Sequence, residues 1–424
     1  MKDTPILLLQ GNYYGTLTAA RSFGEYGCSV HVADAGFSGA ALYSRWVQKT
    51  WRCPPLSQES PFLNWLIEYG QRRPGTFLYP SSDDACFLIA KNREALQSHF
   101  LLLSPALDTL MTLLDKARLH RTLQDLQQPV LPTAFPNNAQ EATVLQTDYP
   151  CLLKPRTQVL QKSGIKGEIV TAGHELSQAF ATFQSTMRLA PSILSYDGTL
   201  GIPMVQQYIA AAPDSIVSVA GFFDAESGVQ ACFARKVLQR PRRLGIGLCF
   251  EAIEPIASLQ ELVATLCRHI GYEGIFEAEF VQTSSSAPFW LMDFNPRFYS
   301  QMAMEVSRHL NLPLLALDLA QQRAGLATQR RKGPKPALPP LNKVKDRYAH
   351  SLILLVFIFG QGATGRMKGG EILRWLGWLI HRQRLTDAVW SFTDPLPGVV
   401  DAVQFVAHAL RYPRGFIRKF FGVS

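Results

Sequence analysis

The chain has 424 residues, of which 47% are hydrophobic and 18% are charged. This length exceeds one small domain and can bury more than one core, so we expect two or three domains. The formal charge of +9 favours anionic partners, but the basic residues are spread along the chain without interleaved aromatic residues. We therefore predict no nucleic-acid partner.

The seven cysteines are odd in number and widely spaced, and no two of them form a CxxC pair. This pattern predicts reduced, mostly buried thiols in a cytoplasmic protein, and it argues against a disulfide framework or a zinc site. The apolar run at residues 5–9 is too short for a signal peptide and is predicted to be a strand.

The first hundred residues alternate between short apolar runs and helical patterns. This β-α-β order predicts a parallel sheet with right-handed crossovers. A GxGxxG turn is absent from the sequence, so a dinucleotide site is not expected. The predicted strands are residues 5–9, 28–34 and 76–80, and the predicted helices are residues 16–26, 61–70 and 85–96.

Acidic residues follow the third of these strands. We expect Asp83 or Asp84 to cap the helix that comes next. A helical pattern then runs over residues 107–126, and prolines soon after it break the pattern. A domain boundary is therefore predicted near residues 110–130.

The middle of the chain reads as an α+β region. Lys154 lies inside an apolar strand, where an unpaired lysine is costly to bury, so its side chain should face a cleft or an anion. The glycine-bearing turn Ser163–Gly167 follows that strand. The predicted strands are residues 149–155, 168–172, 202–209, 215–223 and 229–237, and the predicted helices are residues 174–187 and 255–271.

Two further apolar strands flank a polar turn at residues 282–287 and predict an antiparallel hairpin. Because side chains alternate along a strand, Asp293, Asn295 and Arg297 share one face. The hairpin would bring Glu279 beside Asp293. Two acids and an amide oxygen suit Mg²⁺, and a nearby guanidinium suits phosphate oxygens. Spacing alone fits a solvated hairpin equally well.

The C-terminal part of the chain differs from the rest. Residues 331–345 are rich in proline and lysine and predict an extended connector. Residues 351–359 are intensely apolar but about half as long as a membrane-spanning helix, so we predict a buried strand. Helical patterns at 370–382 and 399–412 carry aromatic and basic residues. Packing on the body of the protein is favoured for them, with contact to a membrane surface as the alternative.

The ordered set of segments resembles the ATP-grasp superfamily over about residues 5–320, in particular its carboxylate-amine ligase-like members, such as D-aspartate ligase and carbamoyl-phosphate-synthase-like proteins. The segments that carry the resemblance are Asp115-Lys116, Leu152-Leu-Lys-Pro155, Ser163–Gly167, Met204–Ile209, Arg235-Lys236 and the hairpin with Glu279, Asp293, Asn295 and Arg297.

The resemblance implies an α/β and α+β architecture in three parts. A parallel α/β domain would cover residues 1–110, and a two-lobed ATP-grasp domain would cover residues 111–325. The ATP lobe would span about residues 145–210 and the metal-binding lobe about residues 211–325. An α-rich C-terminal extension would follow over residues 326–424.

The resemblance also implies a site for ATP and Mg²⁺, with Mn²⁺ as an alternative metal. Arg297 would contact the transferred phosphate or the acyl phosphate, and Lys236 the triphosphate. Glutamate is more usual in the family at positions 207 and 293. The implied metal ligands are Glu279, Asp293 and Asn295, and the implied nucleotide contacts are Lys116, Lys154, Lys166, Gln206, Gln207, Tyr208, Ile209 and Lys236.

The implied activity is that of an ADP-forming carbon–nitrogen ligase. A carboxylate would attack the γ-phosphate of ATP, and an amine or amino acid would then displace phosphate from the acyl phosphate. The alternatives are an ATP-dependent carboxylase of the same superfamily and a catalytically silent nucleotide-binding protein at the membrane surface. By proximity to the hairpin, the residues expected near the acceptor are Tyr299, Ser300, Gln301 and Arg308.

The expected partners are a small-molecule carboxylate and an amine or amino acid. We also expect a homodimer, and a cytoplasmic protein whose C-terminal helices would make any peripheral contact with the inner face of the membrane.

Overall fold

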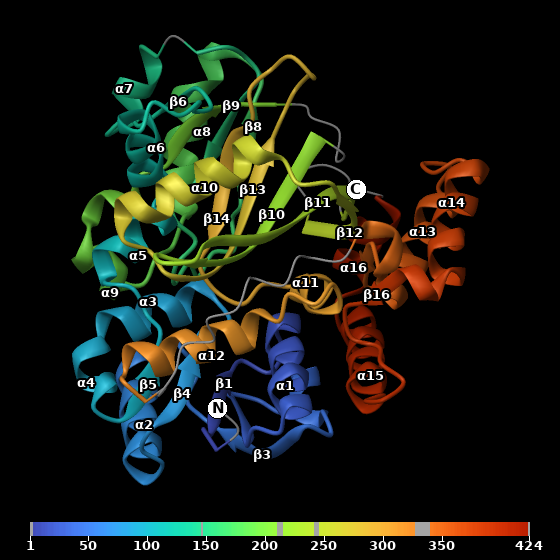
Figure 1. Cartoon of the computed structure of the whole chain (residues 1–424). Coiled ribbons are helices and arrows are strands. Elements are labelled where there is room, and N and C mark those ends of the chain that lie inside the picture. Colours follow the sequence, from blue (N-terminus) through green and yellow to red (C-terminus); the bar gives the residue numbers. More distant parts are fainter. Residues whose placement is uncertain (1–2, 146, 210–214, 241–245, 327–339, 423–424) are drawn as a thin grey trace.

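The computed structural model describes residues 3–145, 147–209, 215–240, 246–326 and 340–422. The described chain contains one five-stranded, one seven-stranded and one four-stranded β-sheet. In Figure 1 the N-terminal sheet lies at the bottom, the four-stranded sheet at the top, and the C-terminal helices at the right. The seven-stranded sheet occupies the centre between them.

The N-terminal sheet has the strand order β3-β2-β1-β4-β5, and its neighbouring strands all pair in parallel. Its central strands are buried along their whole length because helices cover both faces. The predicted parallel sheet is therefore confirmed. Its elements are β1 (Ile6–Leu9), α1 (Tyr14–Tyr26), β2 (Val30–Asp34), η1 (Ala40–Tyr43), β3 (Val47–Arg52), α2 (Glu59–Arg72), β4 (Thr76–Tyr79), α3 (Asp83–Lys91), α4 (Arg93–Gln97) and β5 (Phe100–Leu102).

The predicted cap of α3 was wrong. Ser82 is the capping residue, since its side chain accepts a hydrogen bond from the backbone N–H of Ala85. Asp83 and Asp84 lie in the first turn and bind other parts of the chain: the Asp84 carboxylate accepts from the backbone N–H of Leu160 at 2.6 Å. Serine satisfies the helix end, which leaves both carboxylates available for long-range contacts.

The helical pattern over residues 107–126 contains two helices, α5 (Leu107–Leu114) and α6 (Lys116–Asp125). The break falls at Asp115, whose backbone is extended and whose carboxylate accepts from the N–H of Ala117. Asp115 thus opens α6 as its cap, and Lys116 is the first helical residue, as the family resemblance implied.

The four-stranded antiparallel sheet has the order β6-β9-β7-β8. Helix α8 packs on it through Leu176, Phe180 and Phe183, which join a small core of their own. The elements of this lobe are β6 (Thr133–Ala134), α7 (Ala139–Thr143), β7 (Cys151–Lys154), β8 (Glu168–Val170), α8 (Gly173–Thr186), α9 (Pro191–Tyr196), η2 (Gly198–Gly201) and β9 (Met204–Gln207).

The seven-stranded sheet has the order β14-β13-β10-β11-β12-β15-β16. Helix α10 covers one face, and α11 and α12 connect the sheet to α1 of the N-terminal domain. The elements are β10 (Ile216–Asp224), β11 (Gly228–Arg240), β12 (Ile246–Ile253), α10 (Ala257–Ile270), β13 (Gly274–Val281), β14 (Trp290–Asn295), α11 (Met302–Ser307), α12 (Leu312–Arg323), β15 (Arg347–Ala349) and β16 (Leu385–Asp387).

The C-terminal extension adds β15 and β16 to the edge of this sheet and packs four helices beside it. The predicted strand at residues 351–359 was wrong, because this segment forms a helix whose Leu354, Phe357 and Ile358 are buried among neighbouring helices. An apolar run that is buried on several sides lacks the periodicity that separates helix from strand. The elements are η4 (Leu341–Lys343), α13 (Ser351–Ala363), α14 (Gly369–Ile380), η5 (Arg382–Arg384), α15 (Leu396–Arg411) and α16 (Pro413–Phe421).

The other expectations for this region have mixed outcomes. The two predicted helices near residues 370–382 and 399–412 are confirmed as α14 and α15. Most of the predicted connector, residues 331–339, lies outside the described residues. No helix in the described part of the chain is long and apolar enough to cross a membrane. All seven cysteines are buried and free, as predicted.

Candidate functional site

The centre of the candidate site is the hairpin of β13 and β14. Its register pairs Glu277 with Asn295 and Glu279 with Asp293. Directly paired residues of an antiparallel sheet project from the same face, as do residues two apart on one strand. The hairpin therefore presents all four polar side chains on one face, and the prediction that Glu279 lies beside Asp293 is confirmed.

Two lysines from other elements approach the two carboxylates. Lys116 Nζ at the start of α6 lies 2.5 Å from Asp293 Oδ1, and Lys236 Nζ on β11 lies 2.5 Å from Glu279 Oε1. Desolvation acts to raise the pKa of Asp293, but Lys116 and then Lys154 lower it overall. Both carboxylates are thus held next to cations.

Lys154, at the end of β7, lies close to these pairs without sharing them. Among the described residues its ammonium contacts only Gln206 Oε1, at 3.5 Å. Desolvation, with added repulsion from Lys116, lowers the pKa of Lys154 to about 8. Such an ammonium gains from an anionic ligand, as the sequence predicted for a lysine in an apolar strand.

The glycine-bearing turn brings a further lysine to the same region. Lys166 is exposed on the segment between β7 and β8, in which Gly164 has a φ of 66°. Desolvation lowers the pKa of Lys166, and the charges that act on it are those of Asp293, Lys419, Glu279 and Lys236. The cation of the turn is therefore within electrostatic range of the carboxylate pair.

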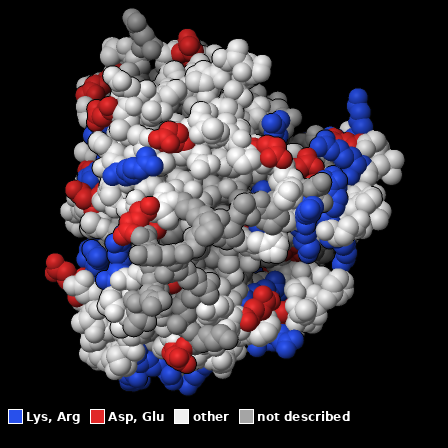
Figure 2. Space-filling model, viewed as in Figure 1, with Lys and Arg blue, Asp and Glu red and all other residues white. Residues whose placement is uncertain are grey.

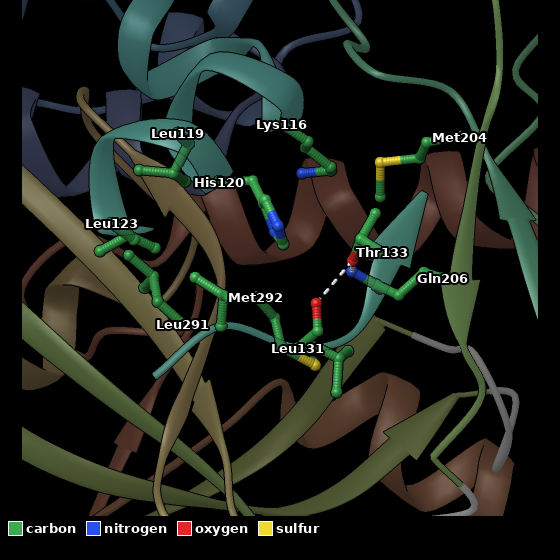
Figure 3. Close-up of a pocket in the computed structure, with 11 residues that line it drawn as sticks. Lys116, Leu119, His120, Leu123, Leu131, Thr133, Met204, Gln206, Leu291 and Met292 are labelled. Atoms are coloured by element: carbon green, nitrogen blue, oxygen red, sulfur yellow. Dashed lines mark hydrogen bonds between the residues drawn. The ribbon is translucent and has the colours of Figure 1, made fainter. Parts of the chain in front are cut away.

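Strand β9, which carries two of the implied nucleotide contacts, lines a neighbouring pocket. Figure 3 shows Lys116 and Gln206 at this pocket, with the Gln206 amide donating to Thr133 Oγ1 at 3.1 Å. Apolar side chains complete the lining, so the pocket combines an apolar wall with a few polar groups, as small-molecule sites do. The lining residues are Lys116, Leu119, His120, Leu123, Val130, Leu131, Thr133, Met204, Gln206, Leu291 and Met292.

The other implied nucleotide contacts lie at the end of β9 and directly after it. The backbone N–H of Gln207 donates to Pro132 O at 2.9 Å, and that of Tyr208 donates to Pro150 O at 3.4 Å. Ile209 is the last described residue before the segment 210–214. The nucleotide contacts implied for Gln206, Gln207, Tyr208 and Ile209 remain predictions.

Asn295 and Arg297 connect the hairpin to the N-terminal domain. Arg297 Nε lies 2.5 Å from Asp83 Oδ1, and Arg297 Nη2 donates to Asn295 Oδ1 at 2.7 Å. The Asn295 amide nitrogen in turn donates to Glu277 Oε2 at 2.6 Å. Burial opposes the charge of Arg297, but Asp83 raises its pKa overall. Arg297 therefore links the end of β14 to the start of α3.

Glu277 is a functional candidate that the sequence prediction missed. It is 2% exposed, and its carboxylate accepts from Ser218 Oγ at 2.6 Å and from Gln301 Nε2 at 3.0 Å. Burial, with Glu279 as the next cause, raises the pKa of Glu277 to about 7. Its spacing of two residues from Glu279 within a strand was the available signal.

The residues expected near the acceptor are mostly enclosed. Tyr299, Gln301 and Arg308 are each less than 9% exposed, and the Tyr299 hydroxyl donates to Glu305 at 2.9 Å. Only Ser300 of the four is exposed. The other three side chains therefore pack inside the protein, beneath the surface that a ligand could reach.

The donor set fits a divalent cation in part. Glu279 and Asp293 are adjacent carboxylates whose side chains are 21% and 46% exposed. In each of them, one carboxylate oxygen pairs with a lysine among the described residues. The Asn295 amide is engaged on both of its ends by Arg297 and Glu277. Within the described residues, no group of three or more His, Cys, Asp or Glu side chains is arranged to hold a metal. The Mg²⁺ site remains a prediction.

Comparison with solved structures identifies the fold. The L-amino acid ligase from Bacillus licheniformis matches with a TM-score of 0.59 and 13% identity, covering 80% of this chain and 78% of that chain. Biotin carboxylase from Campylobacter jejuni matches with a TM-score of 0.58 and 18% identity, covering 81% of this chain and 74% of that chain. N5-carboxyaminoimidazole synthetase from Staphylococcus aureus matches with a TM-score of 0.56 and 14% identity, covering 75% and 78%.

These similarities show that the chain has the ATP-grasp fold. Its parallel N-terminal sheet, its two antiparallel lobes and its C-terminal helices agree with the architecture that the sequence resemblance implied. No protein-family model and no curated protein matches the sequence. The particular reaction is therefore argued from the site.

Proposed function

We propose that this protein is an ATP-dependent, ADP-forming ligase that joins a carboxylate to an amine or amino acid. The observation that carries the proposal is Lys154, an ammonium of lowered pKa that lies beside two lysine–carboxylate pairs and has no described carboxylate of its own. A polyphosphate supplies the missing anionic partner. Relatives in fold include the L-amino acid ligase named above.

In the proposed first step, a carboxylate oxygen of the substrate attacks the γ-phosphorus of ATP, and the bond to the bridging oxygen of ADP breaks. Lys154 and Lys236 bind phosphate oxygens, and Lys166 approaches from the turn above them. These fixed cations oppose the negative charge that is spread over the equatorial oxygens. Lys116 holds Asp293 in place during this step.

In the proposed second step, the amine nitrogen attacks the acyl carbon, the carbon–oxygen bond to phosphate breaks, and a proton leaves the nitrogen. Arg297, with its guanidinium fixed by Asp83 and Asn295, lies beside the hairpin where the leaving phosphate needs a cation. No nucleophilic side chain of the protein takes part.

Glu279 and Asp293 are the residues that would hold Mg²⁺. When bound, Mg²⁺ would neutralise phosphate oxygens and orient them for in-line transfer. Asn295 would orient Glu277 and Arg297, because both ends of its amide are already engaged by these two residues. As a metal ligand it would use the remaining lone pair of its amide oxygen.

The test is ADP and phosphate release by purified protein with Mg-ATP and mixed panels of carboxylates and amines. We expect release only when both a carboxylate and an amine are supplied, and at least about 100-fold less with Lys154→Met, because one lost electrostatic contact to the transferred group costs about this much. A matched control is Lys162→Met, which removes an exposed lysine from the segment that connects β7 to β8.

Three outcomes would count against the ligase. Release that requires bicarbonate and no amine would identify a carboxylase instead. Tight ATP binding without turnover across a broad panel would favour the silent nucleotide-binding protein. Turnover that survives Lys154→Met or Asn295→Ala would show that the chemistry occurs elsewhere.

A further inference from the structure

Helix α15 carries a row of apolar side chains that the described parts of the chain leave uncovered. Leu396, Val399, Val403, Val406 and Leu410 follow one another at alternating spacings of three and four residues, so they form one stripe along the helix. Their exposed fractions lie between 47% and 78%. At a rise of about 1.5 Å per residue, the stripe is about 21 Å long.

Aromatic residues continue this apolar stripe at both ends of α15. Before the helix, Trp390 and Phe392 are 40% and 79% exposed, and the Trp390 ring lies against Gly398. After the helix, Tyr412 is 50% exposed, with the Arg411 guanidinium 5.5 Å from the centre of its ring. Trp and Tyr combine an apolar body with a polar tip, which suits them to the boundary between water and lipid.

The charged side chains of the C-terminal helices are mostly basic. Residues 366–424 contain nine Lys or Arg and four Asp or Glu. Three of the acids are engaged by the protein: Asp387 accepts from backbone N–H groups, Asp394 is 1% exposed, and Asp401 binds His350. Figure 2 shows basic side chains gathered at the right-hand edge, over these helices. The exposed basic residues are Arg366, Lys368, Arg374, Arg382, Arg384, Arg411, Arg414, Arg418 and Lys419.

We propose that α15 docks on an anionic lipid bilayer, with its apolar stripe in the interface and the neighbouring basic side chains against the headgroups. An uncovered apolar stripe with interfacial aromatics and a basic surround is the combination that a peripheral membrane helix uses. Helix α14 also exposes two apolar side chains, Leu373 and Ile380, which are 69% and 75% exposed. The proposal is independent of the ligase reaction.

Charge distinguishes a bilayer from a second copy of the chain as the occupant. A symmetric pairing of two α15 helices would supply no anion for the four cations of α15 and α16, because Asp401 is the only acid on these two helices and it already binds His350. An anionic bilayer covers the same apolar stripe and also neutralises the surrounding cations.

The experiment is co-sedimentation of the full chain with vesicles of phosphatidylcholine alone or with about 30% phosphatidylglycerol. We expect binding to the anionic vesicles, at least tenfold weaker binding to the neutral ones, and weakening by salt. Val403→Glu with Val406→Glu should reduce binding at least tenfold. Arg414→Gln with Arg418→Gln should reduce it about 30-fold if both charges reach the surface. The control is Val144→Glu, at a residue that is 78% exposed directly after α7 and should leave binding unchanged.

Several outcomes would overturn the proposal. One is a failure to bind anionic vesicles, and another is binding that the Val403→Glu/Val406→Glu variant retains. A third is a homodimer, measured by sedimentation without vesicles, that this variant converts to a monomer while vesicles bind neither form. Ligase activity measured in vesicle-free solution reports on the catalytic site alone, so failure of the membrane proposal and failure of the ligase proposal are distinguishable.

Discussion

The pKa of Lys154 predicts a pH-dependent affinity for ATP. In the free protein the pKa of this ammonium is lowered to about 8 from an ordinary 10.5, chiefly by desolvation and then by Lys116. Asp293 and Glu279 act in the opposite direction. A bound polyphosphate adds negative charge and raises the pKa again, so at a pH above 8 binding must take up a proton. Affinity for ATP therefore falls as the pH rises through 8.

The magnitude follows from linkage. If the pKa in the complex stays above the range studied, the dissociation constant rises with the fraction of deprotonated Lys154 in the free protein. Between pH 7.5 and pH 9.5 it should increase about 25-fold, with a limiting slope of about tenfold per pH unit. Glu277, with a pKa of about 7, completes most of its titration below this window. Isothermal titration calorimetry of ATP at constant ionic strength measures the effect.

Two variants isolate Lys154 as the cause. Lys154→Arg keeps the charge across the window because the guanidinium does not deprotonate, so its profile should be flat to within about threefold. Lys166→Met is the matched control. The pKa of Lys166 is also lowered, so this variant measures how much of the slope comes from Lys166. A wild-type profile that stays flat to pH 9.5, or a slope that persists in Lys154→Arg, would refute the assignment.

Two further predictions concern buried ion pairs. Asp115→Ala leaves Arg156 buried without the carboxylate that now lies 2.5 Å away, so the free energy of unfolding in urea should fall by about 3–5 kcal/mol. Asp108→Ala, at a residue whose side chain is 87% exposed, should cost less than about 1 kcal/mol, and equal losses in the two variants would contradict the argument. Asp394→Ala removes the buried partner of Arg21 between the C-terminal extension and the N-terminal domain. Limited proteolysis near residues 385–395 should accelerate at least about tenfold, and an unchanged cleavage pattern would show that other contacts hold the extension.

The sequence predicted the elements whose pattern is local. The β-α-β order of the first hundred residues predicted a parallel sheet, which β1, β2 and β4 confirm. Alternation along the second strand of the hairpin placed Asp293 and Asn295 on one face, because a strand fixes the direction of every second side chain whatever lies around it. A lysine in an apolar strand similarly indicated a cleft at Lys154.

Local pattern failed where burial came from several sides. Residues 351–359 are apolar at almost every position, so neither period of two nor period of 3.6 was visible in them. Only the packing of α13 against its neighbouring helices identified the segment as a helix. The cap of α3 was missed for a related reason: serine and aspartate are equally good caps in sequence, and the structure uses the carboxylates elsewhere.

By itself, then, the sequence determined which strands exist, which side chains share a face, and where carboxylates and lysines suit a phosphate and metal site. The tertiary structure decided which of these groups meet. Lys116 reaches Asp293 across 177 residues, and Asp83 holds Arg297 across 214. Such pairs depend on how separately folded sheets dock, and no local periodicity encodes that geometry. The tertiary structure also buries Glu277. It leaves Lys154 as the cation with which an anionic substrate can pair.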